Sequence, residues 1–137
     1  MKNVFLVGLA SLLLAACGAT GTKFSSMTEP AEGQSKLYVY RTSAFKGNGV
    51  HYNVYANDKL IGNIRSGGYL STELAPGDYE IWGKTEVRRS VKVPLRPNEI
   101  QCVKASVGFG FFVGHPKFEL VPLDKCKAEI TQTVASH

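Results

Sequence analysis

The side chains that could act as metal ligands or nucleophiles are few and widely spaced. None of the three histidines, His51, His115 and His137, has a second histidine or cysteine two or four positions away, the spacings that place two ligands on one side of a strand or helix. Cys102 and Cys126 are too far apart to form the C-x-x-C pair that is common in zinc sites. The sequence therefore predicts no metal site, and we interpret His115, which lies between Gly114 and Pro116, as a turn residue.

Short patterns that imitate enzyme motifs are each incomplete. Residues 43–46 (SAFK) match the S-x-x-K pattern of penicillin-binding enzymes, but residues 84–86 (KTE) lack the glycine of the partner motif K-T-G. Residues 108–114 (GFGFFVG) are one residue too long for a dinucleotide-binding loop, and Gly77 and Gly83 are one residue too far apart for a P-loop. We therefore predict that the protein is not an enzyme and has no catalytic residue.

The N-terminal segment has the composition of a secretory signal peptide. Lys2 supplies a positive charge, and residues 4–16 carry no charge. This apolar run is too short to span a bilayer, which takes about 20 apolar residues. Residues 14–17 (LAAC) also resemble the lipobox of bacterial lipoproteins. The alternative is an ordinary signal peptide that is followed by a cysteine by chance.

The lipobox resemblance implies a membrane anchor on Cys17. In that family the chain is cut before the cysteine, whose sulfur carries a diacylglycerol and whose new amino group is acylated. Several acyl chains hold a protein stably at a membrane, whereas one chain holds it only marginally. By resemblance to enterobacterial lipoproteins, Gly18 in place of an aspartate favours the outer membrane. The sequence thus predicts a protein of the bacterial cell envelope, in which residues 1–16 are removed and this covalent lipid is the only added group.

Residues 17–35 (CGATGTKFSSMTEPAEGQS) are rich in small and polar residues and show no apolar period. We expect a flexible tether between the lipidated cysteine and the domain. The formal net charge of the whole chain is only +5, and the removal of Lys2 with the signal peptide lowers it by one. This mild excess predicts no nucleic-acid partner, and we interpret the basic residues between Lys84 and Arg96 as a solvated face. The alternative for them is attraction to anionic lipid headgroups or polymers.

Cys102 and Cys126 remain after Cys17 has been assigned to the lipid. Because an exported protein meets an oxidising compartment, we predict a disulfide between them. The alternative is two buried free thiols.

Alternation of apolar with polar or aromatic residues begins at Lys36 and predicts short strands separated by turns. The predicted strands are 36–41, 50–56, 60–64, 69–74, 79–85, 87–95, 100–107 and 118–123. Within 100–107 the apolar parity slips between Cys102 and Val103, which predicts a β-bulge. Residues 124–135 contain helix formers and predict a short C-terminal helix. This pattern predicts an all-β fold, a small antiparallel β-sandwich of about seven or eight strands.

Three stretches carry a resemblance to the bacterial family DUF2846, a domain of unknown function. They are YRTSAF at 40–45, LAPGDY at 74–79 and GFFVGHPKFEL at 110–120, and the resemblance covers about residues 36–130, which leaves 131–137 as a C-terminal tail. The middle part is also similar to PEGA-type and carboxypeptidase-regulatory-like modules. The family implies exported β-domains that are often lipoproteins, and it implies no reaction.

Two groups of aromatic residues are candidates for partner binding. Phe109, Phe111 and Phe112 alternate with glycines, and we expect them to be mostly buried in a loop that closes one end of the sandwich; the alternative is an exposed patch for an envelope protein or a bilayer. Trp82 and the tyrosines suggest stacking on sugars such as those of peptidoglycan. The sequence favours a non-catalytic binding or structural module at the envelope. The alternatives are a small periplasmic ligand- or glycan-binding protein and, less favoured, an enzyme of unknown type.

Overall fold

The computed structural model describes residues 18–109 and 113–137 of the chain. The described part contains nine strands and one helix, with the following bounds. The strands are β1 (Ser35–Tyr40), β2 (Tyr52–Ala56), β3 (Lys59–Ile64), β4 (Gly68–Leu74), β5 (Gly77–Lys84), β6 (Arg88–Leu95), β7 (Ile100–Gly108), β8 (His115–Val121) and β9 (Val134–Ala135), and the helix α1 is Leu123–Ile130. The predicted strands and the short C-terminal helix are therefore confirmed, with ends shifted by a few residues.

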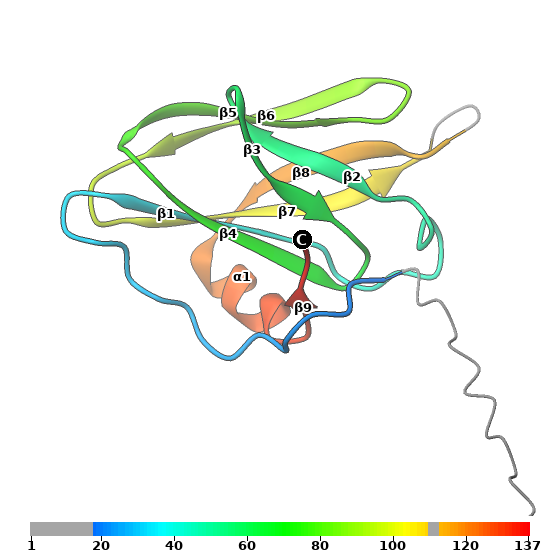
Figure 1. The fold of residues 1–137 in the computed structure, drawn as a ribbon, viewed down its shortest axis with the longest axis horizontal. Coiled ribbons are helices and arrows are strands. Elements are labelled where there is room, and N and C mark those ends of the chain that lie inside the picture. Colours follow the sequence, from blue (N-terminus) through cyan, green and yellow to red (C-terminus); the bar gives the residue numbers. More distant parts are fainter. Residues whose placement is uncertain (1–17, 110–112) are drawn as a thin grey trace, which may run out of the picture.

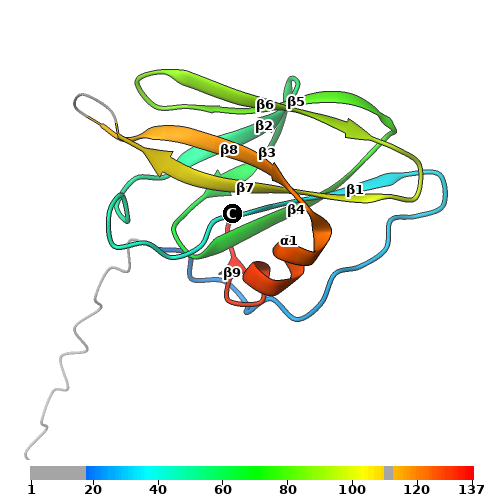
Figure 2. The same cartoon turned by 180° about the vertical axis from the view of Figure 1, so that it is seen from behind.

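The strands form two sheets that pack face to face (Figure 1). The five-stranded sheet has the order β8-β7-β1-β4-β9, and the four-stranded sheet has the order β3-β2-β5-β6. Helix α1 lies on the outer face of the five-stranded sheet, as both views show (Figure 2). The predicted β-sandwich is confirmed. Its five-stranded sheet is not purely antiparallel, because β1 pairs with β7 and β4 pairs with β9 in parallel.

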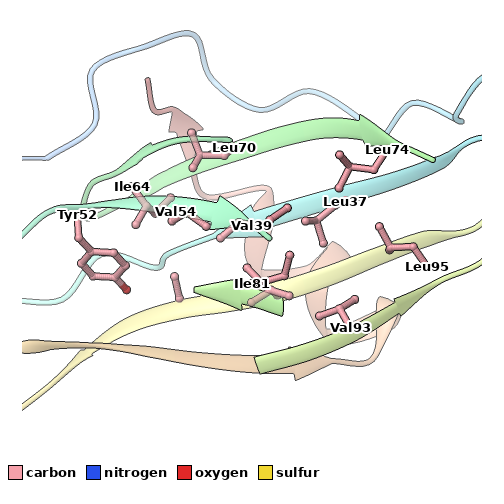
Figure 3. Close-up of a cluster of buried hydrophobic side chains, with 13 residues drawn as sticks. Leu37, Val39, Tyr52, Val54, Ile64, Leu70, Leu74, Ile81, Val93 and Leu95 are labelled. Atoms are coloured by element: carbon pink, nitrogen blue, oxygen red, sulfur yellow. The ribbon is translucent and has the colours of Figure 1, made fainter. Parts of the chain in front are cut away.

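The main core lies between the two sheets and follows the predicted alternation. Leu37 and Val39 of β1 face Ile81 of β5 and Val93 of β6, and all four are essentially inaccessible to solvent (Figure 3). Each such side chain contributes about 1.5–3 kcal/mol through burial. The period-two pattern of the sequence therefore predicts correctly that each strand turns one apolar side toward the main core.

A second buried cluster fills the space between the five-stranded sheet and α1. Tyr38 and Tyr40, on the other side of β1, pack there with Ile130 of the helix. Strand β1 is therefore buried on both faces, and so is the centre of β7, where Cys102 faces the helix and Val103 faces the main core.

This double burial explains the parity slip in β7 without a β-bulge. The pairing of β7 with β8 runs in unbroken register from Cys102 to Gly108, so the predicted bulge at Cys102 and Val103 is wrong. Two consecutive apolar residues simply serve two different cores. The register shift of the other sheet lies between Val54 and Tyr55 of β2.

The predicted disulfide is confirmed between Cys102 of β7 and Cys126 of α1, with Cα atoms 6.2 Å apart. Both residues are buried. A second tie joins the same elements, because the ammonium of Lys104 donates to Glu129 at 2.6 Å. Lys104, together with the Tyr40 hydroxyl, holds the pKa of the Glu129 carboxyl below its usual range.

Residues 18–34 differ from the expected tether, because they lie along the domain. The N–H of Phe24 donates to Thr133, the N–H of Ala135 donates to Thr22, and the Phe24 ring packs edge-on against Tyr69. Phe24 is buried in the second cluster. The C-terminal tail is likewise paired, through β9. The buried ring, the edge of β9 and further hydrogen bonds, such as that of the Thr28 N–H to the Tyr38 hydroxyl at 2.8 Å, hold a segment whose composition is that of a linker.

Tyr52 of β2 places a hydroxyl inside the main core. This hydroxyl donates to the carbonyl oxygen of Ser106 at 2.7 Å, and the side chain is only 3% exposed. Burial raises the pKa of Tyr52 to about 12, because the phenolate would lose its hydration, although the nearby Arg41 favours the charged form.

We expect the raised pKa of Tyr52 to make the fold sensitive to alkali. The stabilising contribution is fully present below the unfolded pKa of about 10 and is lost as the pH rises through about 12. Ionisation of Tyr52 alone should lower the free energy of unfolding by about 2–3 kcal/mol as the pH rises from about 10 to about 12. Denaturant titrations at pH 8, 10 and 11.5 should show a shallower loss for Tyr52→Phe than for the wild type. Tyr79→Phe, which removes a hydroxyl near the surface, is the control, and parallel losses in all three proteins would contradict this account.

Candidate functional site

Several loops meet at one end of the sandwich, which we call the loop end. It consists of the β1–β2 loop (41–51), the β3–β4 turn (65–67), the β5–β6 turn (85–87) and the described parts of the β7–β8 loop (109 and 113–114). The hydroxyl of Thr85 donates to Gly114 at 2.9 Å, and the N–H of Val113 donates to the Glu86 carboxylate at 2.7 Å. These bonds tie the two sheets together at this end.

Arg41 anchors the β1–β2 loop from inside the protein. Its side chain is 3% exposed, and its guanidinium donates to the carbonyl oxygens of Val50 at 2.6 Å and Gly47 at 2.7 Å. Within the described residues no carboxylate lies within ion-pair distance of Arg41, and burial lowers the pKa of its guanidinium. The charge of Arg41 is therefore balanced by backbone carbonyl dipoles. Burying this charge costs free energy, and the buried side chain fixes the shape of the β1–β2 loop.

The loop end exposes large apolar side chains. Phe45 is fully exposed and Phe109 is 83% exposed, with Val113 43% exposed. The Lys46 ammonium lies 5.4 Å from the centre of the Phe109 ring, a cation–π distance that brings the two loops together. A hollow of 160 Å³ between these loops is lined partly by Val50, Val107 and Gly114.

The expected burial of the glycine–phenylalanine segment is wrong for Phe109. Phe111 and Phe112 lie outside the described residues, as do Cys17 and the predicted signal peptide. The side chain that packs in the expected manner is Phe118 of β8, whose ring meets Tyr52 edge-on at 5.8 Å. The loop end therefore carries exposed apolar side chains, Phe45, Phe109 and Val113, among polar residues.

Trp82 lies on the outer face of the four-stranded sheet, away from the loop end. Its ring stacks on Tyr55 of β2 at 4.4 Å, and the guanidinium of Arg88 of β6 lies 3.9 Å from the ring centre. Because β2 and β6 flank β5 on opposite sides, the two partners cover opposite faces of the indole. The indole N–H donates to Asn57. Trp82 therefore offers no free ring face on which a sugar could stack.

The titratable residues of the described part do not form an evident reaction centre. His51 contacts Asn63 at 2.9 Å on the surface, and none of the described residues forms a group of three metal-ligand side chains. A hollow of 470 Å³ lies over β5 and β6, and its lining includes Asp78, Glu80 and Lys92 but no serine, cysteine or histidine. It lacks the pairing of a nucleophile with a base that covalent catalysis uses.

Arg41 is a structural determinant of this site that the sequence-based predictions above do not include. The signal was present, because Arg41 continues the parity of Leu37 and Val39, which face the core. A charged residue at a core-facing position indicates a buried charge with partners. Neither those partners, Gly47 and Val50, nor the contact of Lys46 with Phe109 can be read from the sequence, because both depend on how the loops fold back.

The comparisons with known proteins identify the family and leave its role open. The family model DUF2846, described as a protein of unknown function, matches residues 31–113. The chain belongs to this family, which confirms the resemblance seen in the sequence. The relation to PEGA-type modules stays a prediction.

A curated relative and the search of solved structures add little about role. The chain is 28% identical over 138 residues to an uncharacterized protein of Haemophilus influenzae, an alignment that covers 93% of this chain and 79% of that protein. No solved structure matches the chain. Among the described residues, no helix is long and apolar enough to cross a membrane.

Proposed function

We propose that the protein is a lipid-anchored component of the bacterial cell envelope whose β-sandwich is a non-catalytic binding or structural module. The observation that carries this proposal is the N-terminal sequence, in which Lys2, the uncharged run 4–16 and the tetrapeptide LAAC at 14–17 follow one another. The length of the run suits a cleaved signal peptide, and only a cysteine thiol can form the thioether to diacylglycerol.

Two structural features support this proposal. The disulfide between Cys102 and Cys126 suits an oxidising compartment outside the cytoplasm. Gly18, which would follow the lipidated cysteine, lies at the surface against Ser66, where the N–H of Ala19 donates to the Ser66 carbonyl at 3.0 Å. A lipid on the preceding residue would leave the domain from this point without crossing the core. The residue after the cysteine is Gly18, which favours the outer membrane by resemblance to enterobacterial lipoproteins.

A small glycan- or ligand-binding protein is the alternative. The covered faces of Trp82 argue against sugar stacking at that residue, and the exposed phenylalanines of the loop end favour an apolar partner or surface instead. Neither of these two roles requires catalysis, so the lipid anchor is the feature to test first.

We expect Cys17→Ser to remove the protein from the membrane. In cells fed a radiolabelled fatty acid, the wild-type chain should carry label and sediment with the membranes. The Cys17→Ser variant should carry no label and should lose nearly all of its membrane association, because no thiol remains for the diacylglycerol. Ser66→Ala, which retains the Ser66 carbonyl that accepts from Ala19, is the control and should keep both label and location. Equal label in the wild type and Cys17→Ser would overturn the proposal.

A further inference from the structure

The exposed phenylalanines and the start of the mature chain lie at the same end of the domain. Ser66, in the β3–β4 turn, joins the two regions, because its carbonyl accepts from the N–H of Ala19 and its hydroxyl accepts from the N–H of Ala44 at 3.4 Å. Ala44 precedes Phe45. In Figure 1 the described chain begins, in blue, at the same end of the domain as the β1–β2 loop.

This arrangement limits how far the loop end can be from the membrane. If Cys17 carries the lipid, its attachment point is two residues from Ala19, and two residues span at most about 7 Å. The contacts of residues 19–24 with β9 and the β3–β4 turn leave little slack in the chain between the anchor and the domain. The loop end, which lies beside the anchor, would then be held close to the lipid headgroups.

The composition of the loop end suits that position. Phe45 is fully exposed and Phe109 is 83% exposed, an arrangement that is costly in water and favourable at a bilayer interface. Lys46 follows Phe45 in the chain, and its ammonium lies 5.4 Å from the ring of Phe109. A lysine at this depth places its charge among anionic headgroups while its methylene stem follows the apolar surface.

We propose that the loop end is a membrane-docking surface, in which Phe45 and Phe109 enter the headgroup region of an anionic bilayer and Lys46 binds lipid phosphates. This inference rests on the proposed lipid anchor and deepens it, because it fixes the orientation of the domain. The helix α1 and the outer face of the four-stranded sheet would then point away from or along the membrane and remain free for other contacts.

Site-specific photo-crosslinking in cells tests this orientation. A benzophenone amino acid replaces Phe45 in the full chain, and separately Phe109, and the adducts are analysed by mass. Leu60 and Leu120 are the matched control positions, because they are also exposed apolar residues, at 51% and 38%, on strands β3 and β8. We expect phospholipid adducts at positions 45 and 109 to exceed those at 60 and 120 at least five-fold. Because Phe45 is fully exposed, its replacement should not disturb the fold, and disulfide formation in each variant is the check.

The outcomes separate the inference from the proposed function. An acylated protein with equal or absent lipid adducts at all four positions would overturn the docking surface and leave the anchor intact. A discrete protein adduct at position 45 or 109, in place of lipid, would overturn it in favour of a protein partner or a second copy of this chain. A chain without acyl groups on Cys17 would overturn both.

Discussion

Replacing Cys102 and Cys126 together by alanine is expected to lower the free energy of unfolding by about 3–4 kcal/mol. The disulfide closes a loop with a sequence separation of 24, and in the chain-entropy model such a cross-link removes about this much from the unfolded ensemble. The loss should be felt most in α1, because the bond is a covalent tie of the helix to β7, beside the ion pair of Lys104 with Glu129.

Denaturant titration of the variant and the wild type measures this difference. The wild type titrated in the presence of a reductant is the matched control, since it loses the cross-link but keeps both sulfur atoms. The two proteins should agree to within about 1 kcal/mol, the scale of a small packing change. A variant as stable as the oxidised wild type would contradict a structural role of the disulfide.

Arg41→Met is expected to lower the free energy of unfolding by about 2–4 kcal/mol. The substitution keeps an unbranched side chain of similar reach but leaves the carbonyl oxygens of Gly47 and Val50 without their donors, and each buried acceptor without a partner costs about 1–3 kcal/mol. The relief of burying a charge offsets part of this cost.

The effect of Arg41→Met should also be local. Hydrogen exchange should speed up at the N–H of Val50, which donates to Gly47 within the β1–β2 loop, more than at strands β5 and β6 of the other sheet. Arg41→Lys is the control, because it keeps the charge and one donor group. Its exchange rate in the β1–β2 loop should lie between those of the wild type and Arg41→Met. A uniform increase of exchange across both sheets, with no excess in the loop, would contradict the role of Arg41 as the anchor of that loop.

The strands could be predicted because alternation along one strand is a local property. Leu37 and Val39 define one face and Tyr38 and Tyr40 the other in six residues of sequence. Whether the second face meets water or a helix is decided by α1, far along the chain, and for this reason the parity slip at Cys102 and Val103 predicted a bulge where the structure has two cores.

The segment before β1 shows the same limit. Its composition between Gly18 and Ser35 is that of a linker, and only Phe24 signals that it packs. The edge that receives it is formed in part by β9, which pairs in parallel with β4. A two-residue strand at the end of the chain has no period that a sequence pattern can detect.

The site was less predictable than the fold. The aromatic residues that could bind a partner were identified, but the exposure of Phe109 and the covering of both faces of Trp82 depend on neighbours from other strands. In the sequence, Phe45 is part of the family stretch YRTSAF and of the incomplete enzyme motif SAFK, and neither indicates a binding surface. Its importance arises from the fold, which brings the β1–β2 loop beside the β3–β4 turn and residues 18 and 19.

The most direct test of the account is the mass of the N-terminal peptide of the protein purified from bacterial membranes. We predict a peptide that begins at Cys17 and carries a diacylglycerol on sulfur and an acyl chain on nitrogen, with no peptide from residues 1–16. A peptide that begins elsewhere, or one that begins at Cys17 with a free thiol, would contradict the lipid anchor and with it the orientation inferred for the domain.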